Sequence, residues 1–323
     1  MLLTLSQTQK RIYDLLYRGM QAGKYTVELP AAFPRDSILL MIKLILGEHP
    51  ELVIYDNCYV RFSTYGSVTT VELQPAFKTG GVATARANFE AKVNAILKAI
   101  VKPGASPIQK VLAIHDYMVA NVVYDYDDSS GKVPYIFSHT AYGAIMHGKA
   151  VCEGIACAFS LLAQRAGIET TVVNGVVEDG EHSWNLIRVD GEYYHMDVTW
   201  DIRKQANPKV KIYDHFCLCD RDLRHRNWDK KIYPPCTATR YNYFNVTRTL
   251  VHDRQQLRAL MARQFKKYGA LYFRYDFLQL SEQAACDYFW EEFVSVAREY
   301  GLRVGEVRYT INTDLGIFNL YSV

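Results

Sequence analysis

The chain of 323 residues lacks any apolar run that approaches the roughly 18 residues of a membrane-spanning helix. It also lacks a strong charge of either sign, because 37 Lys and Arg against 34 Asp and Glu leave a net charge of +3. The short basic stretch from Arg221 to Arg226 is interrupted by Asp222 and His225, and we interpret it as a solvated face. We therefore expect neither a nucleic-acid partner nor a membrane partner.

The sequence also lacks the even, regular cysteine spacing of a disulfide framework. It contains seven cysteines at irregular intervals, and Cys217 and Cys219 have no second pair of ligands to complete a zinc site. We expect no metal ion, no cofactor and mostly buried, reduced thiols. The first residues reach Gln7 and Lys10 before an apolar signal core forms, so we predict no signal peptide and a cytoplasmic location.

Internal repeats are missing too, and breaks at Pro103-Gly104 and Pro234-Pro235 divide the chain into three predicted parts. Hydrophobic spacing predicts an N-terminal domain of helices and a hairpin over 1–103, a central domain over 104–235 and a C-terminal module over 236–323. The C-terminal module has the pattern helix, strand, helix and two strands. The predicted fold class is α+β.

The central part contains a cysteine at the predicted start of a helix. Apolar residues follow Cys152 on one helical face, at Ile155, Ala158, Phe159, Leu162 and Ala166, and Gly167 ends the helix. Unpaired backbone N–H groups and the helix dipole at this position favour a thiolate, and the same N–H groups are candidate oxyanion donors. Gly154 allows backbone or substrate to approach closely. Cys157, inside the same helix, is expected to be structural.

A hairpin with an Asp190-Gly191 turn follows this helix. With a two-residue loop and a second strand that continues to Thr199, His182 faces Thr199 and Trp184 faces Asp197. His182 and Asp197 are then diagonal neighbours on one face, with Cα atoms roughly 7–8 Å apart. A three-residue loop with a bulge would instead put them on opposite faces, so this interpretation depends on the loop.

A helix-capping thiol beside an imidazole held by a carboxylate is the Cys–His–Asp arrangement of thiol acyl-transfer enzymes. The imidazole takes the thiol proton and later protonates the leaving amine, while the carboxylate fixes the tautomer of the ring. Other residues remain open as alternatives. His195 shares the face of His182 and is a competing base, and Asp201 is a competing carboxylate.

Two further polar residues of the central part are assigned by their position. Asn185 would give a Cys–His–Asn set, but its strand parity points it away from His182. His115 lies on the inner stripe of a helix that begins after Ser106, and we expect it to be a hydrogen-bonding core residue.

Several blocks of this sequence resemble those of bacterial transglutaminase-like proteins. His-Thr-Ala-Tyr-Gly-Ala at 139–144 and Gly-Lys-Ala-Val-Cys-Glu-Gly-Ile-Ala at 148–156 look like their nucleophile block. His-Ser-Trp-Asn-Leu at 182–186 looks like their histidine block, and Tyr-Tyr-His-Met-Asp-Val-Thr-Trp-Asp at 193–201 like their aspartate block. The resemblance covers about residues 105–230.

The resemblance implies a papain-like transglutaminase core in which Cys152 is the nucleophile, His182 the base and Asp197 the orienting group. It leaves supporting roles for other residues of the same blocks: Tyr142 as a candidate oxyanion donor or packing ring, Trp184, His195 and Asp201. A short stretch, Glu-His-Pro-Glu-Leu at 48–52, is similar to one found upstream in some of these proteins.

The implied activity is thiol-dependent acyl transfer on an amide or peptide bond of a protein or peptide substrate. Water as acceptor gives a cysteine peptidase or amidase, and an amine acceptor gives a transglutaminase. The alternatives are a non-catalytic interaction module on the same fold and, with less support, a zinc enzyme that uses Cys152, His182 and His195.

Overall fold

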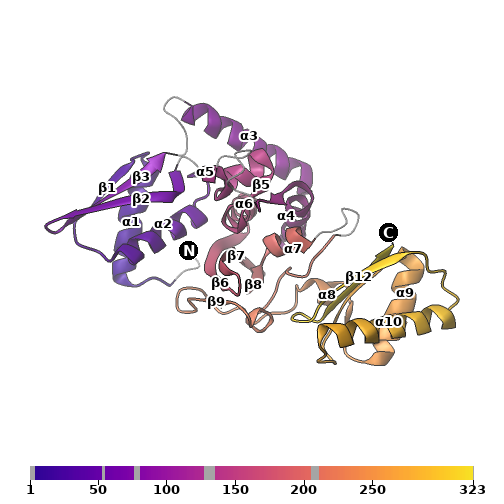
Figure 1. Ribbon diagram of the computed structural model, residues 1–323. Helices are drawn as coiled ribbons and strands as arrows, with labels where there is room; N and C mark the ends of the chain where they lie inside the picture. The colour runs from indigo at the N-terminus through magenta and orange to yellow at the C-terminus, as the bar shows by residue number, and fades with distance from the viewer. Residues whose placement is uncertain (1–3, 53–54, 76–80, 127–134, 205–210, 323) are drawn as a thin grey trace. The chain divides into compact units, whose positions relative to one another are not determined.

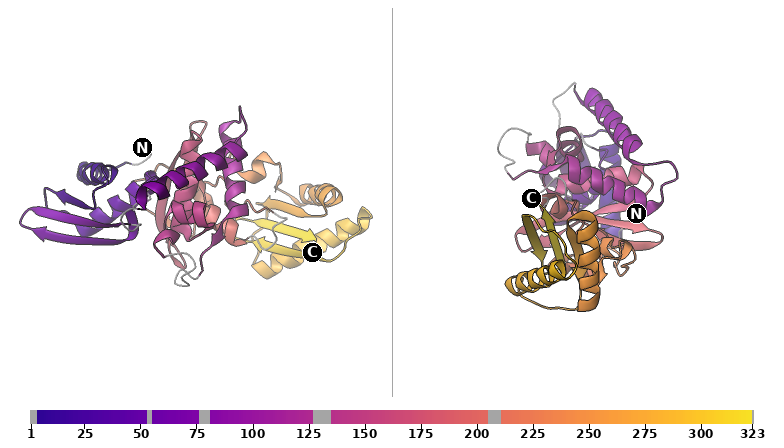
Figure 2. Two further views of the ribbon diagram at one scale, coloured as in Figure 1. Left: turned by 90° about the horizontal axis from the view of Figure 1, so that it is seen from above. Right: turned by 90° about the vertical axis from the view of Figure 1, so that its right-hand side faces the viewer.

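A computed structural model describes residues 4–52, 55–75, 81–126, 135–204 and 211–322. It divides the chain into two compact units, Met1–Ala238 and Thr239–Val323 (Figures 1 and 2). The first unit holds both parts predicted before residue 235, and the boundary near residue 103 stays a prediction. Within the described ranges, every helix is too short or too polar to cross a membrane.

The N-terminal region of the first unit combines two helices with a three-stranded antiparallel sheet of order β1-β3-β2. Its elements are α1 (Gln7–Gln21), β1 (Thr26–Leu29), α2 (Arg35–Glu48), β2 (Tyr55–Tyr65) and β3 (Val68–Pro75). Tyr65 pairs with Val68, so Gly66 and Ser67 form the turn of the hairpin predicted in this part, and Gly66 adopts a positive φ of 59° there. Figure 2 shows the hairpin β2–β3 as a long ribbon at one end of this unit.

The rest of the first unit forms the helix-on-sheet core that carries the site. Its helices are α3 (Val82–Ile100), α4 (Pro107–Asn121), α5 (Tyr135–Ser138), a π-helical turn (Gly143–His147), α6 (Cys152–Arg165), α7 (Val198–Lys204) and a 3₁₀ turn (Asp220–Leu223). The strands are β4 (Val123–Tyr124) and β5 (Lys149–Ala150), paired with each other, and β6 (Glu169–Val177), β7 (Gly180–Val189), β8 (Glu192–Met196) and β9 (Asn227–Trp228). The last four form an antiparallel sheet of order β8-β7-β6-β9.

Helix α2 is fastened to the nucleophile helix α6 by its own C-terminal carbonyl groups. The last carbonyls of a helix have no partner within it, and here the Ser160 hydroxyl donates to the Gly47 carbonyl at 3.3 Å. The Gln164 amide likewise donates to the Glu48 carbonyl at 2.9 Å. A Cβ on Gly47 would lie 2.8 Å from Val172, so a glycine is needed for this close approach. The N-terminal region therefore supports α6 directly.

The β7–β8 hairpin has the predicted register. Val189 pairs with Glu192 across a two-residue loop, and Asp190 and Gly191 have positive φ values of 51° and 87°. Two positive φ values are the requirement of a type I′ turn, which matches the twist of the flanking strands. The bulged alternative is therefore wrong.

The second strand of this hairpin is shorter than predicted. Pairing stops at Met196, and Thr199 lies in α7 rather than opposite His182. The Asp197 N–H donates to the carbonyl of His215 at 3.1 Å, so the chain leaves β7 and turns into α7. Asp197 consequently lies at the junction between strand and helix.

The second unit is an α+β module, as predicted. Its elements are α8 (Tyr243–Val246), β10 (Leu250–Val251), α9 (Arg254–Tyr268), β11 (Leu271–Tyr275), α10 (Glu282–Glu299), β12 (Val307–Asn312) and β13 (Ile317–Ser322), with sheet order β10-β11-β13-β12. Phe289 of α10 packs against Phe273 and Phe318 of the sheet, and Phe293 packs against Phe265 of α9 in the same core. Strand β10 was not predicted, because two residues give no periodicity. The predicted α+β fold class is confirmed.

Candidate active site

Cys152 is the first residue of α6, and its side chain is partly exposed. Val151, the residue before it, has an extended backbone. The first backbone N–H groups of α6 have no partner within the helix and lie at its N-terminus, where Cys152 is placed. A Cβ on Gly154 would lie only 2.4 Å from the carbonyl oxygen of Ser138, so α5 approaches α6 more closely than any larger residue allows. Cys157 is fully buried, and burial raises the pKa of its thiol well above the usual value, in agreement with a structural role.

His182 and Asp197 lie in direct contact, as predicted, although Asp197 follows the last strand pair, Asn185 with Met196, and is not paired with Trp184. The Nε2 of His182 is 2.8 Å from Oδ2 of Asp197, and both side chains are buried. Burial alone would lower the pKa of the ring, but the charge and hydrogen bond of Asp197, together with a hydrogen bond to Cys152, raise it to about 9. With Nε2 occupied by Asp197, Nδ1 is the ring nitrogen left for the thiol.

The two oxygens of Asp197 have separate partners. Oδ1 accepts a hydrogen bond from the Trp200 N–H at 3.3 Å and so caps the first turn of α7. Oδ2 accepts from His182 and also from Nη1 of Arg226. Burial opposes the ionised form, but the charges of His182 and Arg226 outweigh it and hold the pKa of the Asp197 carboxyl far below its usual range. Asp197 is therefore a carboxylate at all ordinary pH values.

Arg226 is the residue of this site that the sequence interpretation missed. Its side chain is only 8% exposed, so the interpretation of the whole stretch from Arg221 as a solvated face is wrong at this position. The guanidinium lies over the rings of Trp184 and Trp200, 5.3 Å and 5.9 Å from their centroids. Its neighbour Asn227 begins β9, whose pairing with β6 holds the segment in place.

The indole ring of Trp184 packs directly against the candidate base, His182. Its ring stacks on His182 at 5.8 Å between centroids, and its Nε1–H donates to Nδ1 of His195 at 3.0 Å. His195 in turn contacts Asp220 through Nε2 at 2.9 Å. His195 shares a face with His182 as predicted, but the indole lies between the two rings. His195 is therefore a support of Trp184 and is not placed to act as a competing base.

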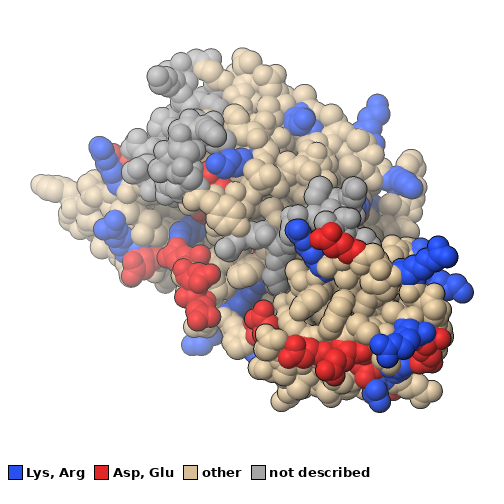
Figure 3. Space-filling view, turned by 45° about the vertical axis from the view of Figure 1, so that its right-hand side comes forward, with Lys and Arg blue, Asp and Glu red and all other residues tan. Residues whose placement is uncertain are grey.

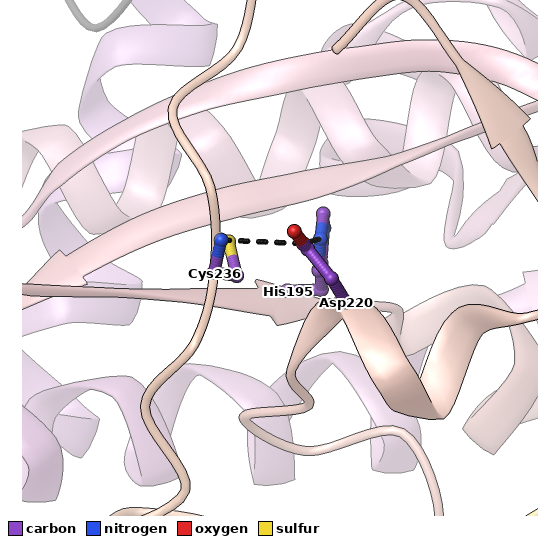
Figure 4. A group of neighbouring side chains, drawn as sticks. All are labelled: His195, Asp220 and Cys236. Atoms are coloured by element: carbon purple, nitrogen blue, oxygen red, sulfur yellow. Dashed lines mark hydrogen bonds and ion pairs between the residues drawn. The ribbon is translucent and has the colours of Figure 1, made fainter.

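His195, Asp220 and Cys236 form a cluster whose possible ligand atoms all lie within 4.8 Å of one another, with Asp220 partly exposed and the other two buried (Figure 4). Burial raises the pKa of the Cys236 thiol above its usual range and lowers the pKa of His195. A neutral histidine that binds a metal through Nε2 carries its proton on Nδ1. Here Nδ1 accepts the hydrogen bond of the Trp184 indole, so the proton is on Nε2 and points at Asp220. The hydrogen bonding fits a network that fixes the indole better than a metal site.

The three residues weighed as a zinc centre, Cys152, His182 and His195, are not brought together around one point. His195 is turned toward Asp220, and Cys217 and Cys219 are buried without forming a group of metal-ligand spacing among the described residues. The proposed set of zinc ligands, Cys152, His182 and His195, is therefore wrong.

Asp201 does not replace Asp197. It is fully buried one helical turn further along α7, where it accepts from Nε2 of His115 at 3.0 Å and from Nδ1 of His215 at 3.0 Å. These two hydrogen bonds outweigh burial and lower the pKa of Asp201. The hydrogen bonds of His115 to Asp116 and to Asp201 likewise outweigh burial and raise the pKa of His115. His115 is therefore the hydrogen-bonding core residue that the sequence predicts.

The contacts of Asn185 and Tyr142 are made with residues other than His182. Asn185 is buried and donates to the carbonyl of Ala156 in α6 at 2.9 Å, so the strand parity argument is correct. The Tyr142 ring packs against Phe89 and Phe137, with centroid distances of 5.5 Å and 5.0 Å. These contacts give the ring a packing role, and its role as an oxyanion donor stays a prediction.

The central part of the chain matches a known protein family. Residues 94–198, which include all three triad candidates, match the sequence model of the transglutaminase-like superfamily. This segment is a transglutaminase-like domain. Arg226 and the cluster at Asp220 and Cys236 lie beyond the matched segment.

Solved structures with similar chains include a TGase, at 18% identity and a TM-score of 0.31 over 43% of each chain. A candidate cysteine protease from Cytophaga hutchinsonii is 13% identical with a TM-score of 0.29, over 44% of this chain and 61% of that one. A candidate protease from Parabacteroides distasonis is 12% identical with a TM-score of 0.25, over 42% of this chain and 35% of that one. Each match covers less than two thirds of the other chain. No curated protein gave a significant match.

Proposed function

We propose that the transglutaminase-like domain performs thiol-dependent acyl transfer on amide or peptide bonds, with Cys152 as nucleophile, His182 as base and Asp197 as orienting carboxylate. The observation that carries the proposal is the 2.8 Å contact between His182 Nε2 and Asp197 Oδ2. It leaves Nδ1 for the Cys152 thiol, which lies at the first turn of α6. This is the arrangement that nucleophilic catalysis by a thiol requires.

The reaction begins with transfer of the thiol proton to Nδ1 of His182. The Cys152 thiolate attacks the carbonyl carbon, and the C–S bond forms as the carbonyl electrons move to oxygen. The imidazolium then gives its proton to the amine nitrogen, the C–N bond breaks, and an acyl-thioester remains. Asp197 stays ionised and stabilises the imidazolium throughout.

The acceptor decides which enzyme class results. Water, activated by neutral His182, releases a carboxylic acid and regenerates the thiol, whereas a primary amine forms a new amide bond. Hydrolysis is our leading proposal because water is always present, and a peptidase or amidase acting on a protein or peptide is the corresponding enzyme. Amine transfer by a transglutaminase is the second possible outcome of the same chemistry.

The decisive experiment incubates the full chain with casein, with and without a labelled primary amine. Appearance of cleaved peptides supports hydrolysis, and incorporation of the label supports amine transfer. Cys152→Ala should abolish either product. Absence of both products with the active wild-type thiol would exclude casein and move the search to other amides.

Alkylation tests the thiol without a substrate. Cys152 should react with iodoacetamide at neutral pH at least tenfold faster than Cys286. Cys286 is the reference because it is also partly exposed, while burial and nearby carboxylates raise the pKa of its thiol. His182→Ala should remove the difference. Equal rates in the wild-type protein would refute the enzymatic proposal and favour a non-catalytic interaction module.

A further inference from the structure

Arg226 contacts the same carboxylate oxygen that receives the hydrogen bond of His182. Nη1 of Arg226 and Nε2 of His182 both donate to Oδ2 of Asp197. The guanidinium lies over the rings of both Trp184 and Trp200. A buried arginine in this position is a permanent positive charge one carboxylate oxygen away from the candidate base.

We propose that Arg226 is a positioning residue of this site, which shares the Asp197 carboxylate with His182 and limits how tightly the ring holds its proton. The inference rests on the proposed function, because it assigns Arg226 a part in proton transfer at the same site. The segment that carries it, residues 220–236, lies outside the matched domain.

The physical reason is the balance of charge around one ring. A single carboxylate next to an imidazolium favours the protonated ring, and a base that holds its proton too tightly is a poor acid toward the leaving amine. Arg226 neutralises part of the Asp197 charge and repels the imidazolium. Removing Arg226 therefore raises the pKa of His182 further.

Other charged groups near the ring do not replace Arg226. Cys152 faces the ring from α6 and Asp197 from the end of β8, and both favour the imidazolium. The charge of His215 acts on Asp197, and its Nδ1 is bound to Asp201. His195 lies beyond the Trp184 indole and is neutral while it accepts the indole hydrogen bond.

Trp184 and Trp200 explain why the residue is an arginine rather than a lysine. A planar guanidinium stacks on aromatic rings and donates in a fixed direction, whereas an ammonium is a compact, strongly hydrated charge. Arg226→Lys should keep the sign of the charge and restore most of the effect. Arg226→Gln removes the charge and keeps a hydrogen-bond donor for Asp197.

The test is an NMR titration of the histidine rings in the full chain with Cys152→Ala, and His182→Gln identifies the His182 signal. Two unit charges about 6 Å apart in a protein interior shift each other's pKa by roughly one to two units. Arg226→Gln should accordingly move the titration midpoint of His182 upward by about one pH unit or more. Arg226→Lys should bring it back toward the parent value.

Arg224→Gln is the matched control, since Arg224 is exposed and lies two residues away. It should leave the His182 midpoint unchanged. A midpoint in folded Arg226→Gln that stays within about 0.2 units of the parent would overturn the proposal. If Arg226→Gln does not fold, Arg226→Met keeps a long stem between the indoles without the charge. Failure of both variants to fold would also overturn it, since Arg226 would then be purely structural.

Alkylation rates separate this inference from the enzymatic proposal. In the protein with Cys152 intact, Arg226→Gln should move the pH profile of iodoacetamide reaction to higher pH. An unreactive Cys152 with a shifted His182 midpoint would refute the enzyme and leave the charge-sharing role of Arg226 intact. A reactive Cys152 with an unshifted midpoint would refute only the role of Arg226.

Discussion

Replacing Asp197 by asparagine removes one negative charge from a site that holds two positive groups. The substituted amide keeps the size of the side chain and an oxygen that can cap α7 at the Trp200 N–H. It cannot compensate the imidazolium, so burial then opposes the protonated ring and only the weaker interaction with Cys152 favours it. We expect the pKa of His182 to fall from about 9 to below its ordinary value of about 6.5.

The stability of the first unit should change with pH in a definite direction. The raised pKa of His182 stabilises the fold below about pH 6.5, and this contribution is lost as the pH rises through about 9. The difference between these two values corresponds to at most about 3 kcal/mol in the free energy of unfolding. In Asp197→Asn this contribution is missing at every pH, and Arg226 is left buried without its carboxylate, which adds a cost that does not depend on pH.

Urea unfolding at pH 6.5 and pH 9.5, followed by tryptophan fluorescence, measures this effect. Three of the four tryptophans, Trp184, Trp200 and Trp228, lie in the first unit, so the signal reports mainly on that unit. The destabilisation caused by Asp197→Asn should be largest at pH 6.5 and should shrink by about 2–3 kcal/mol at pH 9.5. Cys152 should also lose at least tenfold in its alkylation rate at pH 7.5.

Asp201→Asn is the matched control, because it removes a second buried carboxylate, four residues further along in α7, that binds two histidines. It should destabilise the fold but leave the NMR titration midpoint of His182 in place. A destabilisation by Asp197→Asn that is the same at both pH values, with an unchanged His182 midpoint, would refute the electrostatic account of this pair.

Three other substitutions test the remaining contacts. Gly154→Ala should destabilise the first unit by about 1–3 kcal/mol in urea unfolding, because the added Cβ would collide with the Ser138 carbonyl. An unchanged unfolding midpoint would contradict the close approach of α5 to α6. Asn185→Ala should cost about 1 kcal/mol through its lost bond to α6 while the pH profile of alkylation stays the same, and a shifted profile would instead make Asn185 part of the site. Glu292→Gln should lower the thermal stability of the second unit, where Glu292 is buried against Arg254 and Arg258, without slowing alkylation of Cys152.

The surface gives little further indication of partners. On the face shown in Figure 3, Asp and Glu side chains gather in a few groups and Lys and Arg side chains are scattered, and neither sign covers the face. On the second unit, Arg258 pairs with both Glu292 and Glu299, so charges of opposite sign lie together there. The expectation of a protein or peptide substrate stays a prediction.

The sequence by itself determined the parts of this protein that depend on neighbouring residues. The Asp190-Gly191 turn chemistry fixes the register of the hairpin as far as Met196, and the chain therefore reaches Asp197 close to His182. Helical spacing after Cys152 fixes the thiol at a helix start. Both results follow from periods of two and 3.6 residues, which a local stretch of sequence already contains.

Only the tertiary structure decided which distant groups surround that pair. Arg226 reaches Asp197 from 29 positions further along the chain, and its neighbours in sequence are exposed. His195 turned out to hold Trp184 because Asp220 and Cys236 close around it from another segment. Such contacts depend on how helices and strands pack, and a buried charge is tolerated only where packing supplies its partner. A local sequence pattern therefore does not predict these contacts.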